Sequence, residues 1–460
     1  MKYAPLGVSY QRKQVLSNPI DEADIAKNIA IHEKDKNAQG KGAHYVMSET
    51  KIAEDRIKWS YVIHEDDPHR EEFVKIIEPL AKKYEMQTPS TPLPFYGDQT
   101  ISNYKQWINK HYDKVNYILR PNHILLIGDP KLIPFEFQSL LDIKANVGRV
   151  CFDTIEEMQN YVTKVINLKN NPPNLRKETL FFAPDWGYTN GTYDATHYSH
   201  NDMVIPLSNT LRNEQIGAKI ITEKQATKDT LKSELEKSQS ALVYVASHGV
   251  GDIEGLENQR ALTGAICGQN WNQDNSDLFT AKDIPDDDTP FLEGSMFVQF
   301  SCFGYGTHKY DDITDLSLSN IAQRKIIADE ALVAAIPKKL LAHPRGPVAF
   351  IGHVNTTYLQ GFYDDNMVLS DEDKRDLSPF ESMLSKAFHN ETMGSTLHDM
   401  NMKAASDAIT FADRINTYDP ISADLETDKA IAREFLSIHD SKNFLLFGDP
   451  GVRLSNMNLK

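Results

Sequence analysis

The sequence predicts an α/β fold built on a mostly parallel sheet, and two observations carry this prediction. Short apolar runs rich in Val, Ile and Phe alternate along the chain with amphipathic segments at helical spacing. Strands that alternate with helices are typical of a parallel sheet covered on both faces. With 460 residues, 40% of them hydrophobic and 25% charged, the chain can form a large core in more than one structural unit.

Three units are predicted in chain order. Residues 1–55 are polar and weakly patterned, and we expect an N-terminal extension that could regulate the protein. Residues 56–173 are predicted to form an N-terminal α/β subdomain, which ends at the Pro172-Pro173 pair. Its clearest predicted strands are 59–63 and 123–127, and Thr154 opens a capping box that begins a helix.

Residues 174–460 are predicted to form a second and larger α/β subdomain. Within it, residues 252–294 lack a clear period, so we expect a surface insertion that covers a cleft or is cut on activation. The predicted strands are 179–183, 218–222, 241–246, 296–300, 347–351 and 444–447. The predicted helices are 203–216, 228–238, 316–341, 379–390, 394–411 and 426–437, with a second capping box at 378–381.

Composition and charge exclude several classes of function. The net charge of −16 argues against nucleic-acid binding and against an anionic membrane surface. No apolar run approaches membrane-spanning length and the N-terminus has no apolar signal region, so we expect a cytoplasmic protein. The three cysteines are sparse and no Cys/His cluster has zinc spacing, so we expect no disulfides, cofactor or metal. The exception is the acidic run 286–288, which could bind a structural calcium ion.

A histidine and a cysteine stand at the ends of two predicted strands. His248 follows the run 241–246, and Cys302 follows the run 296–300. The ends of parallel strands open into a crevice, where catalytic groups of α/β proteins gather. An imidazole can accept a thiol proton, hold the thiolate as an ion pair and later protonate a leaving amine. We therefore predict Cys302 as a nucleophile and His248 as its base.

Small and acidic residues accompany this pair. Gly249 can let a substrate backbone approach His248, and Gly304 can offer an unobstructed backbone N–H group to an oxyanion near Cys302. Carboxylates on nearby loops could orient His248 or line a pocket for the residue before the cut bond, the P1 residue. These carboxylates are Asp185, Asp194, Asp311 and Asp315.

Each of these residues also has an ordinary structural interpretation. A single buried cysteine or histidine at a strand end is more often a core residue, and a loop aspartate is often a helix N-cap. His353 follows another predicted strand and is the rival base, but the Ser-His-Gly context favours His248. We interpret Cys151 and Cys267 as non-catalytic.

Taken together, these segments resemble the clan CD cysteine peptidases, in particular the gingipain-like peptidase family C25. The resemblance rests on segments 125–130, 147–150, 247–249, 301–302 and 445–454. A histidine roughly 50 residues upstream of the nucleophile is also found in the related caspases. The resemblance implies a caspase-like α/β/α sandwich in two subdomains, and peptide-bond hydrolysis by the Cys–His dyad.

The expected setting departs from the resemblance, because the best-known members of the family are secreted and this chain shows no export signal. We expect a regulated intracellular endopeptidase that acts on protein or peptide substrates, with an activating protein partner and bacterial defence as further expectations. We expect cleavage after Arg or Lys, because a buried carboxylate pairs well with these side chains. Arg149 or Arg345 could instead favour an acidic P1 residue. A catalytically silent scaffold and a non-peptidase cysteine hydrolase such as an amidase are the alternatives.

Overall fold

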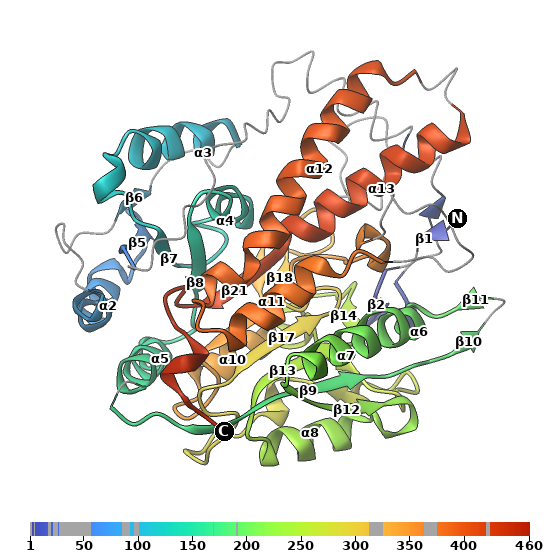
Figure 1. Cartoon of the computed structure of the whole chain (residues 1–460), viewed down its shortest axis with the longest axis horizontal. Helices are drawn as coiled ribbons and strands as arrows, with labels where there is room; N and C mark the ends of the chain where they lie inside the picture. The colour runs from blue at the N-terminus through green and yellow to red at the C-terminus, as the bar shows by residue number, and fades with distance from the viewer. Residues whose placement is uncertain are drawn as a thin grey trace.

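The computed structural model describes residues 2–3, 5–16, 20–21, 26, 57–84, 93–95, 101–168, 170–189, 192–311, 325–362, 375–419 and 424–460. A single large sheet runs through its centre (Figure 1). From edge to edge its strands are β12 (Gly217–Thr222), β9 (Asn174–Ala183), β13 (Ser240–Ala246), β17 (Met296–Phe300), β20 (Ala349–His353), β21 (Phe444–Gly448), β8 (Asn146–Val150), β7 (His123–Ile127), β5 (Trp59–His64) and β6 (Leu93–Phe95), while β22 (Asn458–Leu459) pairs with β9.

The sheet is parallel at every described pairing except one. The exception is the pair β20 and β21, which run antiparallel. The remaining pairings along the sheet are parallel. The prediction of an α/β fold with a mostly parallel sheet is thereby confirmed. The central strands are mostly apolar and are buried along their whole length, as expected for strands covered on both faces.

Helices cover both faces of the sheet, as the side chains of β7 demonstrate. Leu125 and Ile127 belong to one hydrophobic cluster, whereas Ile124 and Leu126 belong to another, because successive side chains of a strand point to opposite faces. The first cluster includes residues of α2 (Arg70–Lys83) and α5 (Ile155–Asn167), and the second includes residues of α3 (Ile101–Ile108) and α4 (Phe135–Asp142). The chain therefore has the three-layer α/β/α architecture that was predicted.

The remaining helices surround the other half of the sheet. The two longest, α12 (His398–Thr417) and α13 (Leu425–Lys442), lie side by side (Figure 1). The others are α6 (Ala195–Ser199), α7 (Ile205–Asn213), α8 (Lys228–Lys237), α9 (Leu256–Leu262), α10 (Ala335–Ala342) and α11 (Ser378–Phe388). No described helix is both long and apolar enough to cross a membrane.

Strand β21 divides the sheet into two halves of opposite direction. It runs parallel to β8 on one side and antiparallel to β20 on the other. The strands of the N-terminal half (β5, β6, β7 and β8) therefore point opposite to those of the C-terminal half (β9, β12, β13, β17 and β20). As a result, the carboxyl ends of the two halves lie at opposite edges of the sheet.

A smaller five-stranded sheet lies beside the C-terminal half. Its order is β16 (Leu278–Phe279), β15 (Ile266–Cys267), β14 (Gly249–Gly251), β2 (Gly7–Ser9) and β3 (Gln14–Val15). Segment 252–294 supplies α9, β15 and β16, so it is folded rather than irregular. The described pairs β1 (Lys2–Tyr3) with β4 (Ile20–Asp21) and β10 (Tyr188–Thr189) with β11 (Thr192–Tyr193) are two-stranded.

Two local predictions were wrong. The helix expected over 316–341 begins only at Ala335. Leu332–Val333, within the expected helix, instead forms β19, which pairs with β18 (Gly306–Thr307). Residues 312–324 lie outside the described part of the chain. The capping box expected at 378–381 does not form, since Asp376 accepts the hydrogen bonds of the Ser378 N–H and O–H groups instead. The capping box at Thr154 is confirmed.

Candidate active site

The predicted dyad lies at the carboxyl edge of the C-terminal half-sheet. His248 follows β13 after one residue, Cys302 likewise follows β17 after one residue, and these strands are neighbours in the sheet. Strand β9 borders β13 on the other side, and the loop after it carries Asp185 and Asp194. Both dyad residues are fully buried.

Asp194 orients His248. Both carboxylate oxygens of Asp194 face His248 Nε2, at 3.0 and 3.2 Å. Asp194 is also the N-cap of α6, where it accepts hydrogen bonds from the N–H and the hydroxyl of Thr196. Burial alone would raise the pKa of Asp194, but the charge and hydrogen bond of His248 and the bonds from Thr196 lower it to about 2. The carboxylate is therefore ionised and holds the imidazole ring in place.

Aromatic side chains pack against one side of His248. The Trp186 ring packs on the imidazole at 4.6 Å between centroids, and Trp271 stacks on Trp186 at 5.6 Å. In the described part of the chain, His248 Nδ1 has no hydrogen-bond partner. This nitrogen is consequently available to accept a proton, while Nε2 is bonded to Asp194.

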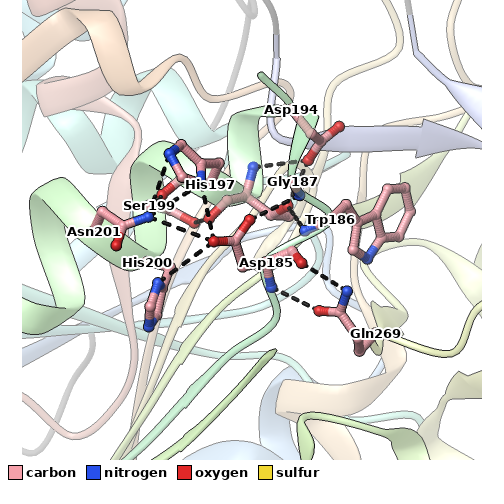
Figure 2. Close-up of polar contacts among 10 residues, drawn as sticks. Asp185, Trp186, Gly187, Asp194, His197, Ser199, His200, Asn201 and Gln269 are labelled. Carbon is pink, nitrogen blue, oxygen red and sulfur yellow. Dashed lines mark hydrogen bonds and ion pairs between the residues drawn. The ribbon is translucent and has the colours of Figure 1, made fainter. Parts of the chain in front are cut away.

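Asp185 has a different set of partners (Figure 2). Its carboxylate lies 2.9 Å from His197 Nδ1 and accepts the N–H of Gly187 at 2.8 Å. Its backbone is clamped by Gln269, which accepts from the Asp185 N–H at 2.7 Å and donates to its carbonyl at 2.6 Å. Asp185 thus ties the loop after β9 to segment 252–294, and its described hydrogen bonds do not include one to His248.

Cys302 is held by the loop that follows β20. The Thr357 N–H donates to Cys302 Sγ at 3.2 Å, and the thiol lies 3.7 Å from the Thr357 carbonyl oxygen. Burial raises the pKa of Cys302 well above its usual range; the Thr357 N–H offsets part of this effect, and the charges of Asp440 and Asp311 add to it. Burial and these two carboxylates therefore favour the protonated thiol in this conformation.

Two backbone donors converge beside the thiol. The N–H groups of Cys302 and Gly249 both donate to the carbonyl oxygen of Leu6, at 2.9 and 3.2 Å. A side chain at position 249 would collide with the Cys302 carbonyl oxygen, so glycine is required there. Gly304 does not share this arrangement, because its N–H donates to Ser301 O at 3.4 Å. Leu6 and Thr357 were not singled out from the sequence, since no local pattern marks them.

His353 contacts a supporting loop. Its Nδ1 lies 3.4 Å from Asn355 O and its Nε2 lies 3.6 Å from Asp440, whose carboxylate accepts the Tyr358 N–H. Burial lowers the pKa of His353 well below its usual range. Together, His353, His439 and Asp440 place their donor atoms within 4.8 Å of one another, so these three residues could hold a metal ion. The described contacts of His353 support loop 354–358, which carries Thr357.

The other predicted candidates lie in varied places. Asp311 is almost fully buried and its charge affects Cys302, whereas Asp315 lies outside the described residues. Arg149 donates to main-chain carbonyls and Arg345 pairs with Glu293, so the two arginines considered for an acidic P1 pocket have other partners. In the run 286–288, Asp286 pairs with Lys339 and Asp287 accepts the Thr289 N–H. Cys267 is buried and Cys151 half-buried.

A sequence comparison decides the family. The model of peptidase family C25 matches residues 84–455. The chain belongs to peptidase family C25. The match covers Asp194, His248 and Cys302 but not Leu6, which lies upstream of it. No curated protein sequence matches the chain significantly.

Solved structures with a similar fold are distant in sequence. The Arg-specific cysteine proteinase gingipain R has 11% identity and a TM-score of 0.46, over 88% of this chain and 80% of that one. The complex of Porphyromonas gingivalis RgpB pro- and mature domains has 12% identity and a TM-score of 0.44, over 86% and 79%. A structure described as a protease has 12% identity and a TM-score of 0.49, over 87% and 79%. Identities this low do not indicate which residues act.

Proposed function

We propose that this member of family C25 is a cysteine endopeptidase in which Cys302 is the nucleophile and His248 its general base. The observation that carries the proposal is the convergence of the Cys302 and Gly249 N–H groups on one peptide carbonyl, that of Leu6. Two such donors beside a cysteine can stabilise the oxyanion of an acyl-transfer intermediate. Membership of a peptidase family supports the same reaction class.

In the proposed reaction, His248 accepts the Cys302 proton and the thiolate attacks the carbonyl carbon of the substrate peptide bond. The N–H groups of Cys302 and Gly249 bind the oxyanion that forms. As the intermediate collapses, the C–N bond breaks and His248 gives its proton to the leaving amine, so a thioester remains on Cys302. Water then hydrolyses the thioester with His248 as base. Asp194 fixes the imidazole and stabilises its positive charge.

For the P1 residue we propose Arg or Lys. Among the described acidic candidates, Asp194 is bonded to His248 and Asp185 to His197. Asp311 is almost fully buried and its charge affects Cys302. A buried carboxylate favours a guanidinium or ammonium group. The specificity stated for gingipain R, which is for Arg, points the same way.

Cys302→Ala provides the test. We expect the variant to lose hydrolysis of every peptide that the unsubstituted protein cuts and to keep its fold, because the covalent route is lost while the volume change is small. Matched fluorogenic peptides with Arg, Lys, Asp or Leu at P1 measure both activity and preference. Near-normal cleavage by the Cys302→Ala protein would refute the dyad. Faster cleavage after Asp or Leu would refute only the basic preference.

Two rival functions predict other results in the same assay. A silent scaffold would cut no peptide, and its Cys302, once open to solvent, would alkylate at the rate of an ordinary thiol. A non-peptidase cysteine hydrolase would show a reactive Cys302 but would release only small amide groups. An intracellular setting, control by an activating protein and a role in bacterial defence belong to this proposal, and detection of the native protein in cell fractions tests the first.

A further inference from the structure

The N-terminal arm, which we define as residues 5–16, crosses the candidate active site as an extended peptide. Leu6 N–H donates to Thr357 O at 3.1 Å, and Leu6 O accepts the two converging N–H groups described above. The N–H and carbonyl groups of Leu6 are therefore both hydrogen-bonded, the first to the loop after β20 and the second to Cys302 and Gly249. Leu6 itself is fully buried.

The next residue of the arm lies directly on the thiol. A Cβ atom added to Gly7 would be 2.8 Å from Cys302 Cβ and 2.9 Å from Sγ, closer than real Cβ atoms approach. Only glycine therefore fits at this position. The Leu6–Gly7 peptide bond consequently lies beside Cys302, with its carbonyl oxygen bound by the two backbone donors.

Beyond Gly7 the arm extends the small sheet. Strand β2 pairs in parallel with β14, the strand that begins immediately after His248. The chain then turns and β3 returns along β2, so that Leu16 N–H donates to Gly7 O at 2.9 Å. Addition of a strand to a sheet edge is a recurrent way to bind an extended peptide.

Segment 252–294 holds the far end of the arm. The Asp252 carboxylate accepts the Ser9 hydroxyl at 2.7 Å and lies 3.3 Å from Arg12 Nε. The Lys13 ammonium group donates to the Asn275 side chain. These polar contacts are exposed or half-buried, so each contributes little to holding the arm in place.

We propose that the channel between β14 and loop 354–358 is the substrate-binding groove, and that the arm fills it as an internal pseudosubstrate with Leu6 at P1 and Gly7 at P1′. This inference rests on the proposed function. It follows that the groove takes an extended peptide by strand addition to β14, with a small residue after the cut bond. Leu6 lacks the charge that a carboxylate in the P1 pocket would bind, so the arm blocks the site instead of being cut.

Gly7→Val tests the closure of the groove. The added side chain cannot fit against Cys302 and should expel the arm, while Asp194, His248 and Cys302 stay unchanged. We expect alkylation of Cys302 by iodoacetamide to become at least about tenfold faster, since a site that is open only about a tenth of the time reacts through its open fraction. Gln11→Ala, at the exposed turn of the arm, is the matched control and should alkylate like the unsubstituted protein.

Alkylation also separates failure of this inference from failure of the proposed function. Faster alkylation of the Gly7→Val protein supports the closure even if no peptide is cut, in which case only the peptidase assignment fails. An unchanged alkylation rate, in a variant whose circular dichroism spectrum is native, overturns the closure. A synthetic peptide of residues 1–16 should slow alkylation of the Gly7→Val protein, and the same peptide with valine at position 7 should not.

Leu6→Arg tests the P1 assignment. If Leu6 occupies P1, this variant should cut its own chain between residues 6 and 7, with transfer of the acyl group to Cys302 and then to water. Mass spectrometry would detect a chain that begins at Gly7, and the Leu6→Arg, Cys302→Ala double variant should stay intact. An intact Leu6→Arg chain in a protein that cuts Arg peptides would overturn the placement of Leu6. Cleavage of the unsubstituted chain at this bond would overturn the inhibitory role.

Discussion

The two halves of the central sheet differ in the use of the polar groups near their strands. In the N-terminal half, Arg149 on β8 is fully buried and its guanidinium donates to Gln138 Oε1 and to the carbonyls of Gly128 and Ile133. These contacts all join residues of the N-terminal half itself. In the C-terminal half, Cys302 and Gly249 direct their N–H groups at the N-terminal arm, which lies outside the family match.

This difference separates residues that hold the sheet together from residues that can bind a substrate. A buried polar group with a complete set of internal partners contributes to structure, because its hydrogen bonds leave none for a ligand. A strand end whose donors meet an exchangeable segment can release that segment and bind another. Family C25 segments occur in both halves, so the sequence match alone does not distinguish the two kinds of residue.

The largest effect should come from His248→Ala in the C-terminal half. Loss of the base should lower kcat/KM for peptide cleavage by about 10³-fold or more, since proton transfer by a positioned group contributes about 10²–10⁴-fold. A pH profile of Cys302 alkylation in the Gly7→Val background should shift to higher pH, because the imidazolium that stabilises the thiolate is gone. An unchanged profile would show that another group is the partner, and His353 would be examined next.

A smaller loss of activity is expected for Asp194→Asn. The isosteric amide keeps the contact with His248 but not the charge, so kcat should fall about 10²-fold with little change in KM. The pKa of Asp194 is about 2, below its ordinary value, so this group stabilises the fold above about pH 4 and loses that effect as the pH falls through 2. The unsubstituted protein should therefore lose about 2 kcal/mol of unfolding free energy over this range that the variant does not lose. Parallel acid dependence of the two proteins would contradict the assignment.

In the N-terminal half the expected effect is on stability and not on chemistry. Arg149→Met removes the donors that satisfy the carbonyls of Gly128 and Ile133, so we expect a loss of about 3 kcal/mol in unfolding free energy. Denaturant titration measures this loss, and active-site titration gives kcat per folded molecule, which should be unchanged. A reduced kcat in fully folded protein would show that the two halves are coupled during catalysis.

The smallest effect is expected at Gln269, which joins segment 252–294 to the loop after β9. Gln269→Ala removes both of its hydrogen bonds to the Asp185 backbone. We expect the free energy of unfolding to fall by about 1 kcal/mol or less, because the freed N–H and carbonyl groups of Asp185 can bond to water at this half-exposed site. Limited proteolysis within 252–294 should become faster in the variant. Equal proteolysis rates in both proteins would mean that packing, and not this clamp, holds the segment.

The strands that carry the dyad could be predicted because buried parallel strands are continuous apolar runs. Runs 241–246 and 296–300 became β13 and β17 with nearly the same limits. Asp194 was one of four carboxylate candidates, and only the three-dimensional contact with His248 distinguishes it. The position of Leu6 could not be predicted, since its partners lie some 240 to 350 residues away and its own surroundings carry no pattern. Chain order also gave no sign that β21 lies in the middle of the sheet.

The position of β21 has a consequence for synthesis of the protein on the ribosome. The chain between residues 57 and 353 contains every other strand of the main path, yet its two halves are joined only when Phe444–Gly448 emerges and inserts between them. Until then β8 and β20 are open edges, and an open edge readily pairs with another chain. A nascent chain therefore passes through a long interval in which its own sheet leaves one edge of each of these two strands unpaired.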